Sequence, residues 1–249
     1  MNDMTHPNTS TVPEASEIAH PIVVVGAGPV GLAAAAHLAA RGLPFLVLER
    51  GQGPAAAMRQ WAHVTIFSPW RFNIDIAARE LLEATGWRLA PELLDRDPTA
   101  RELIAQYLEP LAAHPLIAPN VRYDSRVTAI AREDMDLLPN VARFERPFEV
   151  VVDGIGGERR IRARAVIDAS GTWSAPNPAG TNGIPAAGER DGADRIAYGI
   201  PDAFGSERSR YAGRRVLVIG GGHSAMDALL DLAKLKREVP STTLLWAMR

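Results

Sequence analysis

Two glycine-rich turns of the same pattern lie far apart in this chain, at residues 26–31 and 220–225. Each turn follows a short apolar run and precedes a segment with helical character. At such a junction the free amides of the helix start can bind the phosphates of a dinucleotide. Two such turns predict two dinucleotides on one protein, and the simplest chemistry for that pair is electron transfer between them.

The first turn has glycine at its first, third and sixth positions. The first glycine permits the sharp turn, the second lets a pyrophosphate approach the backbone, and the third lets the helix pack closely on the strand. A glutamate ends the next apolar run, where its carboxylate can accept a hydrogen bond from a ribose hydroxyl and would repel a 2′-phosphate. The first turn therefore favours FAD or NAD over NADP, and its candidate contacts are Gly26, Gly28, Pro29, Gly31, Glu49 and Arg50.

The second turn has Gly220, Gly222 and Ala225 at the same three positions. Alanine is tolerated at the third position, with slightly wider packing of the helix. His223 and Ser224 stand at the start of the following helix, where Ser224 can cap the helix or contact a phosphate.

Arg249 ends the last apolar segment, in the place that Glu49 takes in the first unit. A guanidinium there can pair with the 2′-phosphate of NADP through two parallel hydrogen bonds. The identity of Arg249 alone does not decide whether it binds this phosphate or is simply a charged residue at the end of the chain. The matching position in the two units favours NADPH at the second turn.

The elements that position the first turn form a β-α-β unit. Residues 22–25 and 45–48 predict buried parallel strands, and residues 30–41 predict an alanine-rich helix that Gly42 ends. The same order recurs at the second turn, as strand, helix and strand at 216–219, 224–235 and 242–246.

Residues between the two units predict a mixture of helices, strands and irregular segments. Trp61 and Trp70 lie in an irregular stretch at 51–73, where packing beneath a long loop is at least as good an explanation as a binding role. Thr99 and Glu102 have the spacing of a capping box. The further predicted elements are helices at 76–85 and 99–113 and strands at 122–132, 148–153, 160–166 and 165–169.

The composition excludes several classes of protein. The chain has no cysteine, which rules out disulfides, thiolate catalysis and cysteine metal sites, and its six histidines are scattered, so no metal site is predicted. A net charge of −2 gives no electrostatic reason to expect nucleic acid or an anionic membrane as partner. Glycines interrupt the uncharged run at 22–40, so we predict no membrane span and expect a cytoplasmic protein.

The sequence resembles the two-dinucleotide-binding-domain flavoproteins, most closely their flavin-containing monooxygenase-like and thioredoxin-reductase-like branches. The resemblance rests on the first turn with its glutamate, on the segment 166–172 with its exit at 173–178, and on the second turn. It extends from Ile22 to Arg249. It implies FAD at the first turn and NADPH at the second.

The same resemblance places further residues near the flavin. The segment Ala169-Ser170-Gly171 would lie beside it, and Val127 would meet the adenine through its backbone. Gln60 and Trp61 stand where such proteins place residues near the flavin ring. Two features depart from the family: the chain has no Cys-x-x-Cys, and the monooxygenase fingerprint ending in histidine and an aromatic residue is replaced by 195–202.

We therefore predict an α/β protein with a Rossmann-like FAD/NAD(P)-binding fold, a small β-meander and the start of a second Rossmann-like domain. Residues 1–20 are expected to be a disordered tail, 21–205 the FAD-binding domain and 206–249 the beginning of the NADPH-binding domain. A parallel sheet normally carries helices on both faces, so we expect this chain to be shorter than the whole fold. The stretch 173–213, rich in proline, glycine and charge, is predicted to be a linker.

The leading functional hypothesis is an FAD-dependent oxidoreductase that takes hydride from NADPH and uses oxygen to oxidise a small organic substrate. One alternative is an NADPH dehydrogenase or reductase that passes electrons to a quinone or a protein. Another is a flavin-binding regulatory module or an inactive fragment. The sequence predicts no catalytic acid-base pair, and it indicates neither the substrate nor the oligomeric state.

Overall fold

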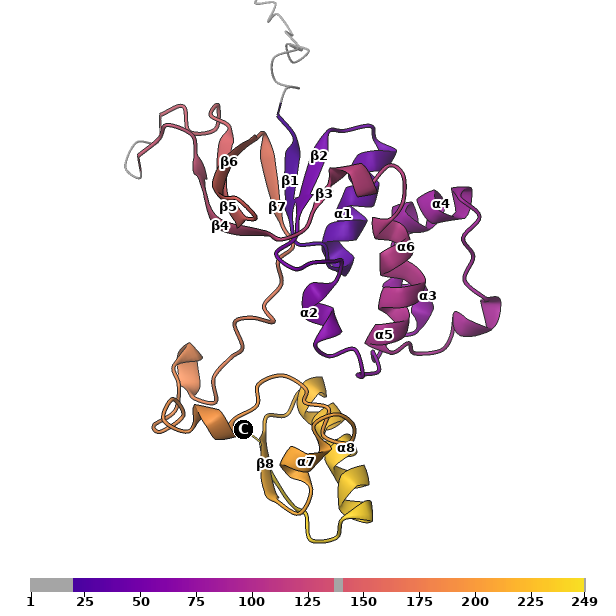
Figure 1. Ribbon diagram of the computed structural model, residues 1–249, viewed down its shortest axis with the longest axis vertical. Helices are drawn as coiled ribbons and strands as arrows, with labels where there is room; N and C mark the ends of the chain where they lie inside the picture. The colour runs from indigo at the N-terminus through magenta and orange to yellow at the C-terminus, as the bar shows by residue number, and fades with distance from the viewer. Residues whose placement is uncertain (1–19, 137–140, 249) are drawn as a thin grey trace, which may run out of the picture.

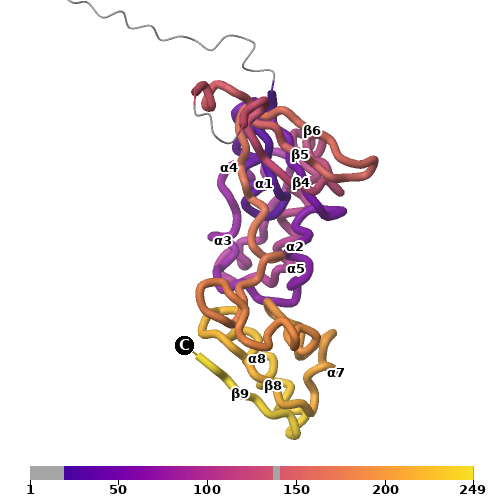
Figure 2. Tube along the Cα trace, turned by 90° about the vertical axis from the view of Figure 1, so that its left-hand side faces the viewer, coloured from indigo at the N-terminus to yellow at the C-terminus, as the bar shows by residue number. Residues whose placement is uncertain are grey.

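The computed structural model describes residues 20–136 and 141–248, and Figure 1 shows two lobes joined by an extended segment. We call residues 20–168 the N-terminal lobe and residues 180–248 the C-terminal lobe. Figure 2, turned by a quarter, shows the same two lobes stacked along the long axis. Residues 1–19 of the predicted tail and Arg249 lie outside the described residues.

A four-stranded parallel sheet forms the centre of the N-terminal lobe, in the order β3-β2-β1-β7. Its two middle strands, β1 (Ile22–Val25) and β2 (Phe45–Leu48), are joined by the helix α1 (Pro29–Ala40), as predicted. The outer strands are β7 (Ala165–Asp168), next to β1, and β3 (Val121–Arg122), next to β2. Val23 and Val24 of β1 are fully buried, because layers cover both faces of this sheet.

The two faces of the sheet carry different layers (Figure 1). On one face lies an antiparallel meander of β4 (Ser125–Arg132), β5 (Phe148–Gly154) and β6 (Gly157–Ala163). Val23, Leu48, Val150 and Val152 pack together between the sheet and the meander. On the other face, α1 packs with the helices that follow β2, in the largest apolar cluster of the described residues.

Short helices and helical turns follow β2. They include the two helical stretches predicted at 76–85 and 99–113, and both are confirmed. The helices and turns are α2 (Ala56–Arg59), α3 (Trp70–Asn73), α4 (Ile76–Ala84), a 3-10 turn (Pro91–Leu93), α5 (Ala100–Leu103), a π-helical turn (Ile104–Leu108), α6 (Glu109–Ala112) and a 3-10 turn (Ala118–Asn120). The capping box of Thr99 and Glu102 is present. Trp70 is fully buried in the apolar cluster, which confirms the packing interpretation for this residue.

The π-helical turn has a local cause in Pro110. Proline lacks the N–H that would bond to the carbonyl four residues earlier, on Gln106. The Trp87 indole Nε1–H donates to that Gln106 carbonyl instead, at 2.8 Å. The predicted helix 99–113 is therefore continuous but locally widened at its centre.

Two predicted strands each divide between the two sheets. The strand expected at 122–132 separates into β3 and β4 at Asp124, which has a positive φ of 49°. The strand expected at 160–166 separates into β6 and β7 at Arg164, whose amide donates to the Pro21 carbonyl. Alternation along the chain continues through both breaks, so the sequence pattern did not show where the chain changes sheet.

The C-terminal lobe holds a second parallel pair, β8 (Arg215–Ile219) and β9 (Thr243–Ala247), joined by α8 (His223–Glu238). Val216, Val218 and Leu244 face the core beneath α8. The opposite face of the pair is apolar and about half exposed at Leu217 and Ile219. Before β8, the stretch predicted as a linker carries 3-10 turns at Thr181–Gly183 and Ala193–Arg195 and the short helix α7 (Arg208–Tyr211).

In the part of the chain that the structure describes, no helix combines the length and apolar character needed to cross a membrane. The uncharged run at 22–40 is instead β1, a turn and α1.

Candidate functional site: a cleft between two glycine turns

A cleft of about 2050 Å³ lies between the lobes, and both glycine turns line it. Gly31 and Gly222 belong to the turns without lining the cleft, and Arg249 lies outside the described residues. The other predicted site residues all line it: Gly26, Gly28, Pro29, Glu49, Arg50, Gln60, Trp61, Val127, Ala169, Ser170, Gly171, Gly220, His223, Ser224 and Ala225.

The first turn is packed so tightly that two of its glycines leave no room for a side chain. A Cβ on Gly26, which has a φ of 98°, would lie 2.7 Å from the Ala169 carbonyl oxygen. A Cβ on Gly31 would lie 1.9 Å from the carbonyl oxygen of Gly26. At Gly28, by contrast, a Cβ would meet nothing within 4 Å, so the backbone there is open to the cleft.

The start of α1 presents free backbone donors to that open space. Gly28 is the N-cap and Pro29 the first helical residue, and no side chain caps the helix. The first amides of a helix lack partners within it, and the helix dipole adds partial positive charge there. An exposed backbone at Gly28 beside an uncapped helix start fits the pyrophosphate of a dinucleotide.

Glu49 is buried at the end of β2 and fastens the turn to that strand. Its Oε2 accepts a hydrogen bond from the amide of Ala27 at 2.8 Å, and its Oε1 accepts one from the amide of Gly51 at 2.8 Å. Each carboxylate oxygen can accept a further hydrogen bond, so a ribose hydroxyl in the cleft still fits. The glutamate thus has a structural role that the sequence did not reveal.

Beyond the first turn, the wall of the cleft is formed by the indoles of Trp61 and Trp173 and the side-chain amide of Gln60. The Trp173 Nε1–H donates to Gln60 Oε1 at 2.8 Å, and the rings of Trp61 and Trp173 lie 6.2 Å apart at 46°. A Cβ on Gly199 would lie 2.5 Å from the Trp173 ring, so Gly199 is needed to seat that indole. Trp173 was absent from the predicted site, although it opens the segment that follows Gly171.

The segment after β7 crosses directly beneath the first turn. The amide of Ala169 donates to the Val25 carbonyl at 2.9 Å. The hydroxyl and the amide of Ser170 both donate to Asp168 Oδ1, and these bonds lower the pKa of the Asp168 carboxyl. Asp168 is therefore a hydrogen-bonded structural carboxylate. Val127 lies on β4, at the point where the pairing of β4 with β5 shifts register.

The second turn is built similarly but more loosely. Gly220 has a φ of 132°, and a Cβ there would meet Ala225 at an ordinary 3.6 Å, which explains why alanine suffices at the third position. Gly222 is the N-cap of α8 and no side chain caps the helix. The capping role considered for Ser224 is therefore wrong, because Ser224 is already the second helical residue.

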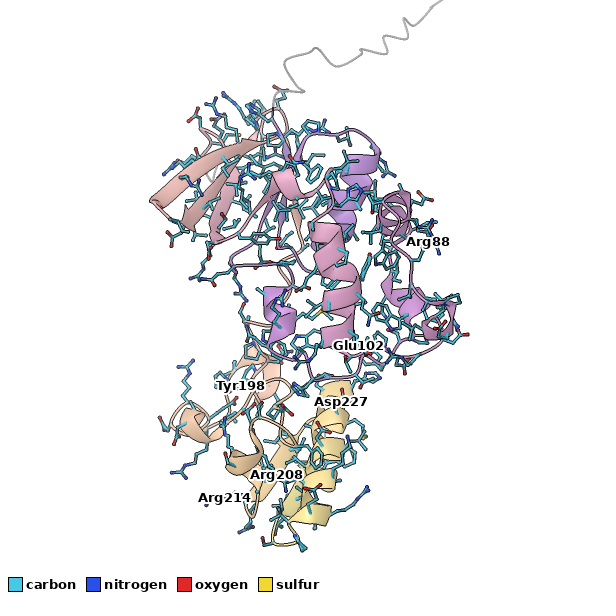
Figure 3. All side chains as sticks on the ribbon, turned by 45° about the vertical axis from the view of Figure 1, so that its right-hand side comes forward. Arg88, Glu102, Tyr198, Arg208, Arg214 and Asp227 are labelled. Atoms are coloured by element: carbon cyan, nitrogen blue, oxygen red, sulfur yellow. The ribbon has the colours of Figure 1, made fainter. Side chains whose placement is uncertain are left out.

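His223, the first residue of α8, contacts the opposite lobe. Its ring is stacked on that of Phe67, with centroids 4.1 Å apart and an angle of 12°. Phe67 also lines the cleft. No sequence pattern indicates this contact, because the two residues belong to different units. Five further cations line the cleft and were not predicted: Arg126, Arg195, Arg210, Arg214 (labelled in Figure 3) and Arg215.

Fold and site together define a Rossmann-like, dinucleotide-binding oxidoreductase class. Residues 23–243 match the model of the pyridine nucleotide-disulphide oxidoreductase family, and the chain belongs to that family. This confirms the predicted fold class.

The relatives agree with the predicted resemblance to flavin-containing monooxygenases. The chain is 30% identical over 215 residues to indole-3-pyruvate monooxygenase YUCCA1 of Oryza sativa subsp. japonica, an alignment that covers 85% of this chain and 45% of that protein. The chain thus spans less than half the length of this relative.

Solved structures show the same fold. A flavin-containing monooxygenase from Stenotrophomonas maltophilia is 25% identical with a TM-score of 0.56, covering 92% of this chain and 57% of that one. Bacillithiol disulfide reductase from Bacillus cereus is 22% identical with a TM-score of 0.65, covering 92% and 67%.

Proposed function

We propose that the chain binds FAD at the first turn and NADPH at the second, and that it is an FAD-dependent monooxygenase acting on a small organic substrate. The observation that carries this proposal is that both turns open into one cleft. Hydride transfer needs the two cofactors to meet, and a shared cleft allows that. The similarity to the rice indole-3-pyruvate monooxygenase and to the Stenotrophomonas flavin-containing monooxygenase supports monooxygenase chemistry.

The proposed role of the chain's own residues is to bind and orient the cofactors. The α1 amides and the open backbone at Gly28 hold the FAD pyrophosphate, and Glu49 accepts from its ribose. The α8 amides and His223 hold the NADPH phosphates. When bound, FAD supplies the chemistry of accepting hydride and activating oxygen. Trp61 and Trp173 form an apolar wall that limits access of water.

Arg249 is proposed to bind the 2′-phosphate of NADPH, and the arginines in the C-terminal part of the cleft add positive potential around it. We keep the division into an FAD-binding domain at 21–205 and the beginning of an NADPH-binding domain at 206–249 as a proposal. A cytoplasmic location is also proposed and is tested by fractionating cells that express the protein.

The electron acceptor distinguishes the monooxygenase from the reductase alternative. The purified chain is reconstituted with FAD and given NADPH, ¹⁸O₂ and a panel of small amines, sulfides and 2-oxo acids. A monooxygenase places one ¹⁸O atom in an organic product and consumes one NADPH per product. NADPH consumption that reduces a quinone, with no ¹⁸O in any product, would favour the reductase. A protein that stays colourless after FAD is added would contradict both.

A further inference from the structure

The junction of the two lobes holds a cluster of titratable side chains that the proposed dinucleotide sites do not use. His63, Asp202 and Asp231 each offer one ligand atom, and these atoms all lie within 4.8 Å of one another. His63 comes from the loop between α2 and α3, Asp202 from the segment before α7, and Asp231 from α8. The three residues are partly buried.

The imidazole of His63 carries a buried polar atom without a partner. Its Nε2 is inaccessible to solvent, and it makes no hydrogen bond to any described residue. Leaving such an atom unpaired is costly, and buried polar atoms without protein partners commonly contact a water or an ion. The buried nitrogen thus points to a ligand independently of the spacing of the carboxylates.

Negative charge is in excess around His63. His223, Asp227 and Asp231 recur every four residues along α8 and therefore share one face of the helix. Asp227 interacts electrostatically with Asp231, His223 and His63, and Figure 3 shows it at the end of α8 nearest the N-terminal lobe. Lys234, whose Nζ lies 2.9 Å from Asp231 Oδ1, neutralises part of this charge.

One carboxylate of the cluster is held firmly in place. Asp202 accepts hydrogen bonds from the amide of Gly205 at 2.9 Å and from the amide and hydroxyl of Ser206 at 2.8 and 2.9 Å. Carboxylates that bind metals are commonly oriented by such outer hydrogen bonds. Bonds of about 2.0–2.2 Å to one ion would place ligand atoms about 3 to 4.4 Å apart. The three atoms here lie within 4.8 Å of one another, so a small closing movement would bring them to that spacing.

We propose that His63, Asp202 and Asp231 bind a divalent transition-metal ion that ties the N-terminal lobe to α8. Imidazole with two carboxylates is a donor set suited to Zn²⁺ and unsuited to Mg²⁺, which prefers oxygen ligands alone. The ion fixes the distance between the two glycine turns without taking part in electron transfer. This site does not depend on the proposed function, because its ligands lie outside the proposed cofactor contacts.

The test is a calorimetric titration of the full chain with Zn²⁺, after treatment with a chelator and in the absence of NADPH. We expect one equivalent of Zn²⁺ to bind and to raise the melting temperature. Asp231→Asn and His63→Gln should each weaken binding by at least about tenfold. Mg²⁺ should bind at least about tenfold more weakly than Zn²⁺.

His37→Gln is the matched control, because His37 also lies beside a carboxylate, with its Nε2 3.1 Å from Asp75, and no second carboxylate of a described residue completes a cluster there. This variant should bind Zn²⁺ as the unmodified chain does. Circular dichroism checks that each variant is folded, and Asp231→Asn, which preserves side-chain size, decides the question if His63→Gln unfolds. Equal Zn²⁺ affinity in the unmodified chain and Asp231→Asn would overturn the proposal, and so would equal affinity for Mg²⁺ and Zn²⁺.

Discussion

The ring of Phe67 lies flat against that of His223, with centroids 4.1 Å apart and planes at 12°. Phe67 belongs to the N-terminal lobe, whereas His223 begins the helix of the second glycine turn. The lobe that carries the first turn therefore helps to position a residue of the second. Because Phe67 is otherwise largely exposed, this contact explains why an aromatic residue stands there.

Replacing Phe67 by alanine should weaken NADPH binding while leaving FAD binding unchanged. A stacked aromatic pair contributes about 0.5–1.5 kcal/mol, so we expect the KM for NADPH to rise about 2- to 10-fold. Phe67→Tyr, which keeps the aromatic ring, should leave the KM for NADPH at the value of the unmodified chain. Phe144→Ala is the matched control, because Phe144 is 90% exposed and lies in the loop between β4 and β5. An unchanged KM in Phe67→Ala would show that the stack has no role in cofactor binding.

Two glycines of the first turn should respond differently to alanine. Gly31→Ala places a Cβ 1.9 Å from a backbone oxygen, so it should lower the free energy of unfolding by about 3 kcal/mol or more. Gly28→Ala meets nothing within 4 Å and should cost less than about 1 kcal/mol, yet weaken FAD binding by obstructing the phosphate. Urea unfolding and FAD titration measure the two effects separately.

Gly53→Ala is the control for both variants, because a Cβ there also meets nothing within 4 Å and Gly53 lies outside the turn. The assignment of the two glycine roles would be wrong if Gly28→Ala unfolded the chain, or if Gly31→Ala kept full stability and full FAD affinity.

Elements with strong local signals were predictable from the sequence. The apolar runs, the glycine spacing and the capping box of Thr99 gave β1, α1, β2, β8 and the start of α5 with small errors at their ends. Where the chain crosses from one sheet to another, at Asp124 and Arg164, the alternation continues and the break depends on tertiary hydrogen bonds. Local pattern carries no information about such bonds.

The free energy of unfolding should depend on pH through the carboxyl group of Glu102 in the capping box. A hydrogen-bonded ion pair with Arg96, together with bonds from Thr99, lowers the pKa of Glu102 from about 4.5 to about 2. Because the folded pKa lies below the unfolded one, this stabilisation is fully present above about pH 4.5 and is lost as the pH falls towards about 2. The partly exposed pair and cap together contribute about 1 kcal/mol.

Urea unfolding at several pH values tests this dependence. Glu102→Gln should be less stable than the unmodified chain at pH 7, and the difference between the two should disappear near pH 2. Glu80→Gln, at an exposed position on α4, should change stability little at any pH. A difference at Glu102 that is constant from pH 7 to pH 2 would contradict the assigned cause.

The preference for NADPH over NADH should depend on Arg249. Loss of a charged hydrogen-bond donor to a phosphate costs about 1.5–3 kcal/mol, so Arg249→Ala should raise the KM for NADPH about 10- to 100-fold and leave that for NADH unchanged. Arg237→Ala, in the last turn of α8, is the control. If the unmodified chain uses NADH as well as NADPH, Arg249 does not have the role proposed for it.

The candidate site was only partly predictable. The glycines and Glu49 have local signatures, and the structure brings them to one cleft with the second turn. Trp173, Phe67 and the cluster around His63 depend on how the lobes meet, and their partners are distant in sequence. Pairings of that kind leave no periodicity or spacing to detect.

Two dinucleotides bound in the one cleft should exchange electrons. Anaerobic mixing of the FAD-loaded chain with NADPH tests it most directly, by following the flavin absorbance bands in a stopped-flow spectrometer. We expect the bands to bleach, and we expect Gly28→Ala, which impairs FAD loading, to reduce the bleached amplitude. A chain that holds FAD but whose bands stay unchanged with excess NADPH would contradict it.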